Sequence, residues 1–210
     1  MKKETITNWV VESPRLIDST DFRLNDVDYN RKLAKKLSGK KKEVIEDTVL
    51  YEIFRTGDDI NGYIVHINKE VKSAPNKEIN YLVKYHARPY KKFGSAVTQV
   101  AIWKRAAGPG IPGITSRIFW GYLFKRWSTI ISDREQTERG KDFWETRLQE
   151  AVEKGYTVGL SFTAMNDVEW YRGDAAGLIK WFKDFEAWGK SKSHLHKRFI
   201  ITRVGLSDIT

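Results

Sequence analysis

One stretch of sequence decides the fold, Ala96–Asp133, which reads AVTQVAIWKRAAGPGIPGITSRIFWGYLFKRWSTIISD. Its first nine residues alternate apolar with polar or small side chains and are rich in β-formers, which predicts a strand ending near Lys104. Glycine and proline interrupt the pattern between Gly108 and Gly113, an aromatic helix is predicted over 114–127, and Thr129–Ile131 is predicted as a short strand. A strand that leads through a glycine turn into a helix presents backbone N–H groups and a positive helix end, so this stretch can hold a phosphate.

The flanking sequence predicts strands before this stretch and helices alternating with strands after it. Strands are expected over Thr48–Arg55, Gly62–Val71 and Ile79–Arg88, the first two joined by a hairpin at Gly57–Asp59. Beyond the stretch we expect a helix over Asp133–Gly155 with Ser132 or Asp133 as its N-cap, a strand over Tyr156–Phe162, a helix capped by Asp174, and a last strand over Arg198–Val204. The predicted fold class is α/β, with a mixed, mostly antiparallel central sheet and flanking helices.

Length and composition favour one globular domain over residues 1–210, in which residues 1–45 form a basic N-terminal helical segment. The apolar content of 40% is enough for a sizeable core. The chain has no Cys, which excludes disulfides, thiolate zinc sites and cysteine nucleophiles and is typical of a reducing cytoplasm. We expect a cytoplasmic protein with no metal and no membrane partner, because no apolar run approaches the ~20 residues needed to cross a bilayer and the first residues do not form a signal peptide.

The net charge of +10 favours an anionic partner, which could be nucleic acid, a phosphorylated cofactor or an acidic protein. Two segments carry much of this charge: a predicted helix ending at Gly39 that runs into a series of lysines, and a polar loop around residue 192. The candidate nucleic-acid-binding residues in them are Lys40, Lys41, Lys42, Lys192, Lys197 and Arg198. A solvated surface that serves only solubility explains the same residues.

The six residues Arg105–Gly110 (RAAGPG) fit the pattern Arg/Gln-x-x-Gly-x-Gly/Ala, between a predicted strand and a predicted helix. In this motif, and in the order of elements from about Thr48 to Phe162, the chain resembles the GCN5-related N-acetyltransferases (the GNAT superfamily), as a distant member of phage or mobile-element type. The resemblance implies a GNAT-like sheet and acetyl-CoA bound with its pyrophosphate on backbone N–H groups, which glycines allow to approach closely. The cofactor-binding residues that it implies are Arg105, Ala106, Ala107, Gly108, Gly110 and, along the pantetheine arm, Ser132.

The chain departs from the family pattern where protons are handled. Pro109 has no N–H, so one donor of the phosphate site is missing. The family often carries a Tyr that protonates the leaving thiolate, but the corresponding stretch offers Phe143 and Trp144, and the strand ending near residue 104 has no carboxylate to act as a base. The remaining catalytic candidates are Asp133 and His86. Helix capping explains Asp133 equally, and a half-buried strand position explains His86.

The leading prediction is an acyltransferase-like protein that binds acetyl-CoA, or a related acyl-CoA, and transfers the acyl group to an amine by direct attack on the thioester. Activity as an enzyme is left open by the missing acid and base. One alternative is a basic protein that binds nucleic acid or modifies a nucleobase on the same fold. Another is a catalytically silent fold that engages an acidic host protein, as an anti-host factor.

Overall fold

The computed structural model describes residues 15–16, 26–69, 77–90, 93–104, 112–133, 135–136, 138–163, 167–189 and 197–209. The chain divides into two compact units. We refer to Ser19–Ile130 as the N-terminal unit and to Ile131–Asp208 together with Met1–Asp18 as the C-terminal unit. Both combine helices with mostly antiparallel strands, so the predicted α/β class is confirmed.

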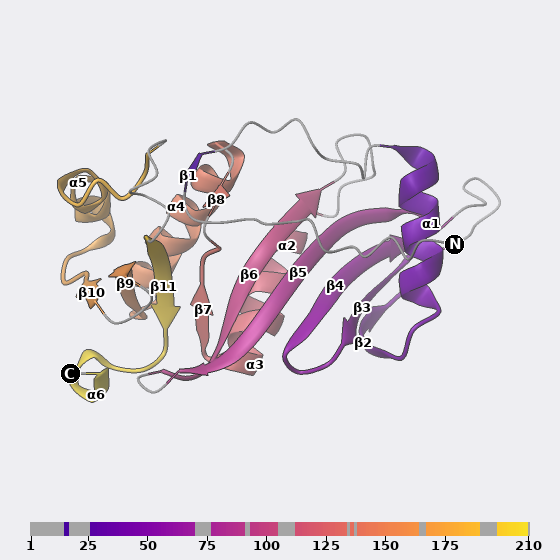
Figure 1. Ribbon diagram of the computed structural model, residues 1–210, viewed down its shortest axis with the longest axis horizontal. Coiled ribbons are helices and arrows are strands. Elements are labelled where there is room, and N and C mark those ends of the chain that lie inside the picture. Colours follow the sequence, from indigo (N-terminus) through magenta and orange to yellow (C-terminus); the bar gives the residue numbers. More distant parts are fainter. Residues whose placement is uncertain are drawn as a thin grey trace. The chain divides into compact units, whose positions relative to one another are not determined.

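The N-terminal unit is built on an antiparallel meander (Figure 1). Helix α1 (Val27–Ser38) precedes strands β2 (Lys42–Asp47), β3 (Tyr51–Gly57), β4 (Asn61–Asn68), β5 (Ile79–Tyr90) and β6 (Gly94–Lys104). The structure therefore confirms the three predicted strands, the strand ending at Lys104, and the hairpin between β3 and β4. It adds β2, which the sequence analysis did not predict.

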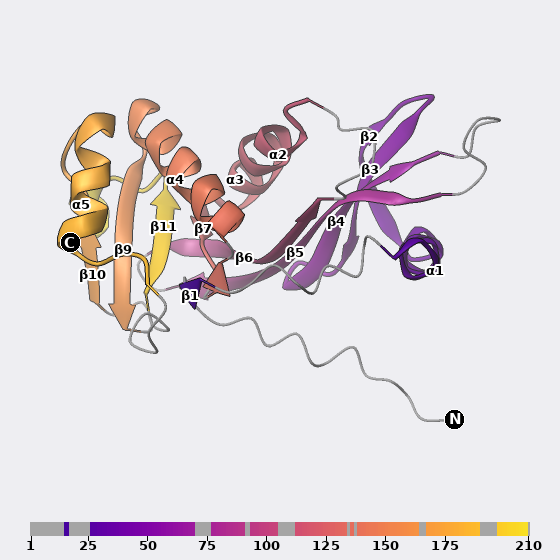
Figure 2. The same ribbon diagram turned by 90° about the horizontal axis from the view of Figure 1, so that it is seen from above.

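The meander has a helix on each face (Figure 2). Because side chains alternate along a strand, Phe54, Val65 and Leu82 share one face, where they pack with Ala34 and Leu37 of α1 in a buried cluster. The alternate positions on the same strands, Ile53, Ile64 and Val83, are also buried and point to the opposite face. That face is covered by the helical segment that follows β6.

This helical segment runs continuously through α2 (Ile114–Ser116), a π-helical turn η2 (Arg117–Leu123) and α3 (Phe124–Trp127), so the helix predicted over 114–127 is confirmed. We call it the π-helical segment. Its apolar side chains Ile118, Phe119, Leu123 and Phe124 are buried. The N–H of Phe124 donates to the carbonyl of Phe119, five residues back, which is the hydrogen bond of a π-helix.

Among the described residues, the C-terminal unit combines the remaining short strands with α-helices and the short 3-10 helix η3. Its elements are β1 (Arg15–Leu16), β8 (Glu135–Gln136), α4 (Glu138–Glu153), β9 (Thr157–Thr163), β10 (Asp167–Trp170), η3 (Ala175–Gly177), α5 (Leu178–Asp184), β11 (Arg198–Thr202) and α6 (Leu206–Ile209), and β7 (Thr129–Ile131) spans the boundary between the units. Strand β9 pairs antiparallel with both β10 and β11. Helix α5 contacts β11 through the rings of Phe182 and Phe199, whose centroids are 5.5 Å apart.

The predicted start of the long helix at Asp133 is wrong by five residues. Residues Glu135 and Gln136 pair in parallel with Arg15 and Leu16, which holds them extended, so α4 begins only at Glu138. Ser132 and Asp133 are therefore not its N-cap. The predicted cap at Asp174 is confirmed, because its carboxylate accepts a hydrogen bond from the N–H of Gly177 at 2.9 Å. No helix within the described ranges combines the length and the apolar character that crossing a bilayer requires.

Candidate functional site

Several predicted site residues lie outside the described residues. These are the implied cofactor-binding residues Arg105, Ala106, Ala107, Gly108 and Gly110, and the candidate nucleic-acid-binding residue Lys192. The described elements on either side of Arg105–Gly110 are β6, which ends at Lys104, and the π-helical segment, which begins at Ile114. The N-cap of that segment is Gly113, in the left-handed conformation with φ 71°, and it offers no side-chain hydrogen bond to the first turn.

The catalytic candidate His86 lies on β5 with both ring nitrogens engaged. Its Nδ1 contacts Oδ1 of Asn61, and its Nε2 contacts Nε of Arg88. Because Nε of a guanidinium can only donate, Nε2 of His86 is the acceptor and the ring proton is on Nδ1. Burial, followed by the charge of Arg88, lowers the pKa of His86. The imidazole is therefore neutral at pH 7, and it could accept a proton at Nε2 only by giving up the contact with Arg88.

Ser132 and Asp133 belong to the C-terminal unit and are both buried. The N–H of Ser132 donates to the carbonyl of Phe199 at 2.9 Å, and the Ser132 hydroxyl accepts from the N–H of Phe199, also at 2.9 Å. Through these two hydrogen bonds, Ser132 pairs with Phe199 of β11 one residue beyond the end of β7. This structural role accounts for its burial without a ligand.

Two of the candidate nucleic-acid-binding lysines are engaged within the protein. The ammonium of Lys42 donates to both carboxylate oxygens of Glu52, at 2.5 and 2.7 Å. The ammonium of Lys197 donates to the carbonyls of Phe185 and Glu186, at 2.9 and 2.7 Å, where α5 ends, and burial lowers its pKa. Arg198 is half-buried on β11, whereas Lys40 and Lys41 are exposed.

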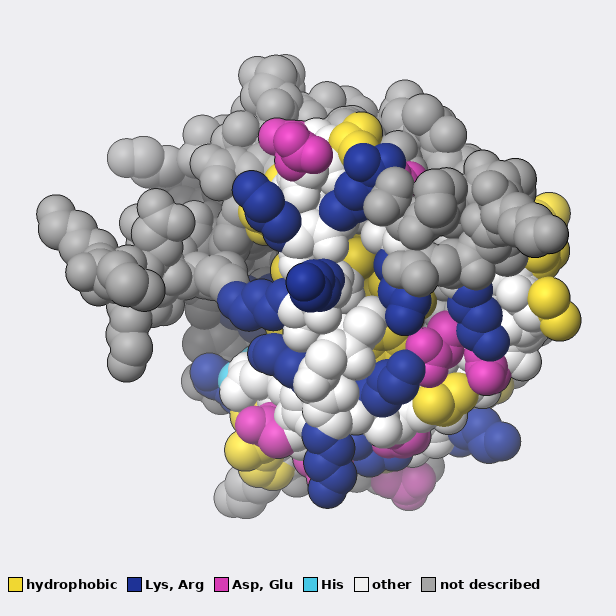
Figure 3. Space-filling model, turned by 90° about the vertical axis from the view of Figure 1, so that its right-hand side faces the viewer, with side chains coloured by type: hydrophobic (Ala, Val, Ile, Leu, Met, Phe, Trp, Pro, Cys, Tyr) yellow, Lys and Arg dark blue, Asp and Glu magenta, His cyan; other side chains and the backbone are white. Residues whose placement is uncertain are grey.

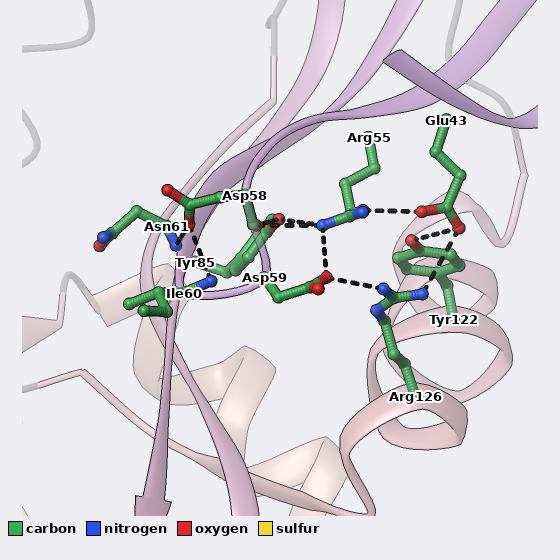
Figure 4. Close-up of polar contacts among 9 residues, drawn as sticks. All are labelled: Glu43, Arg55, Asp58, Asp59, Ile60, Asn61, Tyr85, Tyr122 and Arg126. Atoms are coloured by element: carbon green, nitrogen blue, oxygen red, sulfur yellow. Dashed lines mark hydrogen bonds and ion pairs between the residues drawn. The ribbon is translucent and has the colours of Figure 1, made fainter. Parts of the chain in front are cut away.

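Among the described residues, an extensive cluster of polar side chains joins the meander to the π-helical segment, and we call it the polar network (Figure 4). It consists of Glu43, Arg55, Asp58, Asp59, Tyr85, Tyr122 and Arg126. Arg55 lies at its centre: its Nε donates to Glu43 at 2.9 Å, and its Nη1 donates to the Tyr85 hydroxyl at 3.0 Å and to the Asp58 carbonyl at 3.0 Å. Only 13% of the Arg55 side chain is exposed, so its charge depends on these partners.

The π-helical segment supplies the other half of the polar network. The hydroxyl of Tyr122 donates to Glu43 at 3.0 Å, and Nη2 of Arg126 donates to Asp59 at 2.8 Å. Asp59 also accepts from Arg55, at 3.2 Å. Two guanidinium groups and two carboxylates therefore alternate across the layer, so that each charge has neighbours of opposite sign.

The electrostatics of the polar network keep each group in its ordinary protonation state. Burial acts to raise the pKa of Glu43, but hydrogen bonds from Tyr122 and Arg55 outweigh it and the pKa is lowered. The hydrogen bond from Arg126, with the charges of both arginines, lowers the pKa of Asp59. Burial raises the pKa of both Tyr85 and Tyr122. The carboxylates are thus ionised and the phenols protonated at neutral pH, which suits a structural clamp better than proton transfer.

A second, smaller cluster lies between β2, β3, β4 and the start of η2. Arg117 donates to both carboxylate oxygens of Glu46, at 3.0 and 2.7 Å, and Tyr51 donates to the same carboxylate. The ring of His66 lies 4.9 Å from that of Tyr51, centroid to centroid. His66 is 1% exposed, and its Nε2 has no hydrogen-bond partner in the described part of the chain.

Two local irregularities of the backbone place the side chains of each cluster on facing sides of β2 and the π-helical segment. Residues three apart on a regular strand point to opposite faces, but a bulge between Val44 and Glu46 lets Glu43 and Glu46 both reach the π-helical segment. Residues five apart on an α-helix are about 140° apart around the axis. The wider π turn brings Arg117 and Tyr122 onto one side, where each meets its carboxylate.

Neither cluster was predicted from the sequence. The signal that could have indicated them is polar residues at the buried phase of apolar strands: Arg55 follows Ile53 by two residues, His66 follows Ile64 and Tyr85 follows Val83. A charged or polar residue in such a position requires a partner from the covering element. Which residues become the partners of these polar side chains depends on the bulge and the π turn, and no pattern in the sequence predicts either of them.

Burial of His66 predicts a loss of stability in mild acid. Burial lowers the pKa of His66 from 6.5 to about 4, against the opposing charge of Glu46. Below pH 6.5 the unfolded chain takes up a proton on His66 that the folded chain does not, so stability falls with falling pH until about pH 4. At about 1.4 kcal/mol per pH unit, this residue lowers the free energy of unfolding by about 2 kcal/mol between pH 6.5 and 5.

Urea unfolding followed by tryptophan fluorescence at pH 7, 6.5, 6, 5.5 and 5 measures this loss. His66→Gln should flatten the dependence over that window. His86→Gln is the comparison: the pKa of His86 is lowered in the same direction, but its ring is less buried and is hydrogen-bonded, so this variant should flatten the dependence less than His66→Gln does. Equal pH dependence in the wild type and in His66→Gln would contradict the prediction.

Comparison with known proteins adds no relative: no protein-family model, no curated protein and no solved structure matches the chain. Within the described ranges, no group of three or more His, Asp or Glu side chains is placed to hold a metal ion.

Proposed function

We propose that the protein binds acetyl-CoA, or a related acyl-CoA, through Arg105–Gly110 and transfers the acyl group to an amine. One observation carries the proposal: this glycine-containing segment connects strand β6 directly to the π-helical segment. A strand that leads through glycine into a helix is a phosphate-binding arrangement. Gly113, the N-cap of this segment, is in the left-handed conformation and makes no side-chain hydrogen bond to the first turn.

The order of elements supports the same proposal. A meander of strands, the glycine-containing segment, a helix, a short strand, the helix α4 and the strand β9 follow one another as the resemblance to the GNAT superfamily implies. Arg105 would add a cation beside the pyrophosphate, where its planar guanidinium can donate two hydrogen bonds.

In the transfer step, the nitrogen of a neutral amine attacks the carbonyl carbon of the thioester. The C–N bond forms as the C–S bond breaks, and the proton lost by nitrogen neutralises the departing CoA thiolate. We assign no side chain as the base, because Nε2 of His86 is occupied by Arg88 and Asp133 is buried. The rate enhancement would then come mainly from the orientation of the two bound reactants, which can supply a large share of it.

Titration calorimetry with acetyl-CoA at pH 7 tests the binding step, and native mass spectrometry of the purified protein tests for co-purified CoA. We expect 1:1 binding that Arg105→Gln weakens by about tenfold, since a charge-assisted hydrogen bond contributes about 1.5 kcal/mol or more. Arg172→Gln is the control, because Arg172 is exposed and lies in the C-terminal unit. No binding heat together with no co-purified CoA would refute the proposal. Binding of acetyl-CoA without acyl transfer to any amine, and therefore without release of CoA, would favour a catalytically silent fold.

A further inference from the structure

The outer face of α1 is strongly basic, and we call Arg31, Lys32, Lys35, Lys36, Lys40 and Lys41 the α1 basic face. Helix α1 buries Asn30, Ala34 and Leu37 on one side. With about 100° between successive residues, positions 31, 32, 35 and 36 fall on the opposite side, and all four are exposed. Lys40 and Lys41 extend this surface beyond the C-cap at Gly39. Figure 3 views the molecule from this side, where Lys and Arg side chains gather across the middle.

The lysines of the α1 basic face are not neutralised by any carboxylate that the structure describes. Within the described residues, none of the five forms an ion pair, and only Arg31 has a carboxylate partner, Glu78 at 3.1 Å. In contrast, the cations between the meander and the π-helical segment, Arg55, Arg117 and Arg126, each pair with a carboxylate. Other described cations of this unit, among them Lys84 and Lys125, also lack a carboxylate partner, but α1 and the turn that follows it gather five such lysines within positions 32–41.

We propose that the α1 basic face binds the phosphate backbone of nucleic acid without reading its sequence. The 12-residue helix is about 18 Å long, the axial distance of about five nucleotides of one strand, so its lysines can each meet a phosphate. Lysine suits this role as a mobile point charge that neutralises phosphate and releases its counterions.

Two other anionic partners fit the surface less well. A membrane-binding helix inserts its apolar face into the bilayer, but Ala34 and Leu37 of α1 are buried against the meander and Leu33 is partly buried against the same cluster. Only Val27, at the start of α1, is an exposed large apolar residue of this helix. Protein interfaces are enriched in aromatic residues and depleted of lysine, whereas the α1 basic face has five lysines and no aromatic side chain. Nucleic acid is the occupant that requires charge alone.

Fluorescence anisotropy with labelled 20-mers of arbitrary sequence, as duplex DNA, duplex RNA and single-stranded DNA, tests the proposal between 50 and 200 mM KCl. We expect micromolar binding with a slope of log K against log salt of about −4 to −5 for a duplex, as five phosphate contacts predict. Lys35→Gln/Lys36→Gln should weaken binding by about tenfold at 100 mM KCl and make the slope less steep by about 2. Glutamine is nearly as good a helix former as lysine, so α1 should persist in this variant, which circular dichroism checks.

The control is Lys154→Gln/Lys183→Gln, which removes the same charge from exposed positions of the C-terminal unit. It should change affinity by less than twofold. No binding at 50 mM KCl, or equal weakening in the two double variants, would overturn the proposal. So would binding to anionic phosphatidylserine vesicles that depends on Lys35 and Lys36 while no nucleic acid binds. The outcome does not depend on acyl-CoA binding, which calorimetry measures separately.

Discussion

Replacing Gly62 with alanine is expected to lower the free energy of unfolding by about 3 kcal/mol, because the new methyl group would overlap the core of the polar network. A Cβ at this position would lie 2.4 Å from the backbone oxygen of Thr56 and 2.5 Å from the Tyr85 hydroxyl. The Thr56 oxygen belongs to the backbone of β3 and cannot rotate away, so the backbone of β3 or β4 must shift, and the second overlap requires Tyr85 to move as well. Movement of Tyr85 would in turn remove a hydrogen bond from Arg55.

Chemical unfolding of Gly62→Ala, compared with Gly121→Ala, checks this expectation. Gly121 is exposed within η2, and nothing lies within 4 Å of a Cβ built there, so its replacement should cause no loss. Combining Gly62→Ala with Tyr85→Leu should cost less than the sum of the two single changes, since the smaller side chain removes one of the two overlaps. Equal stability of the two glycine variants would show that the meander accommodates a side chain at Gly62.

Removing the central cation of the polar network should have the second largest effect. Arg55→Met keeps the length of the side chain but leaves Glu43 without its closest cation and the Asp58 carbonyl without one donor. We expect a loss of about 2 to 3 kcal/mol, below the range for a fully buried ion pair because Glu43 is 41% exposed. The melting temperature should fall by about 5 to 10 °C.

Arg31→Met is the matched control for this prediction. Arg31 also pairs with a carboxylate, Glu78, but 42% of its side chain is exposed, and such surface pairs contribute less than about 1 kcal/mol. Arg55→Lys should recover part of the loss, since it restores the charge without the forked geometry. If Arg55→Met were no less stable than Arg31→Met, the polar network would not hold the π-helical segment to the meander.

The sequence predicts local structure well where it depends on neighbours along the chain. Strands β3 to β6 of the meander, the helix over 114–127 and the cap at Asp174 follow from periodicity and short-range hydrogen bonding, and all of them are confirmed. The start of α4 could not be predicted, because the extended pair Glu135–Gln136 is held by Arg15–Leu16, more than a hundred residues away. Strand β2 was missed because its four charged residues, at an edge of the meander, conceal the β pattern.

The candidate site shows the same difference between features that contiguous residues determine and features that depend on distant parts of the chain. The motif at Arg105–Gly110 was visible because its residues are contiguous, and acyl-CoA binding there stays a prediction. The polar network draws Glu43, Arg55, Tyr85 and Tyr122 from four different elements, so only the strand register and the helix phase bring them together. The lysine-rich segment was visible in the sequence, but which lysines are unneutralised was not: Lys42 pairs with Glu52, whereas Lys40 and Lys41 have no carboxylate partner among the described residues.

The bulge in β2 and the π turn in η2 each amount to one inserted residue, and the two insertions serve each other. Loss of a residue between Glu43 and Glu46 would turn one carboxylate to the far side of the strand, and loss of a residue between Arg117 and Tyr122 would swing one of them by about 100° around the axis. Exchanges of side chains at these positions weaken single contacts, but a change of length in either segment uncouples a whole cluster. In any homologue that keeps this layer, the number of residues in the two segments should therefore vary less than their identities.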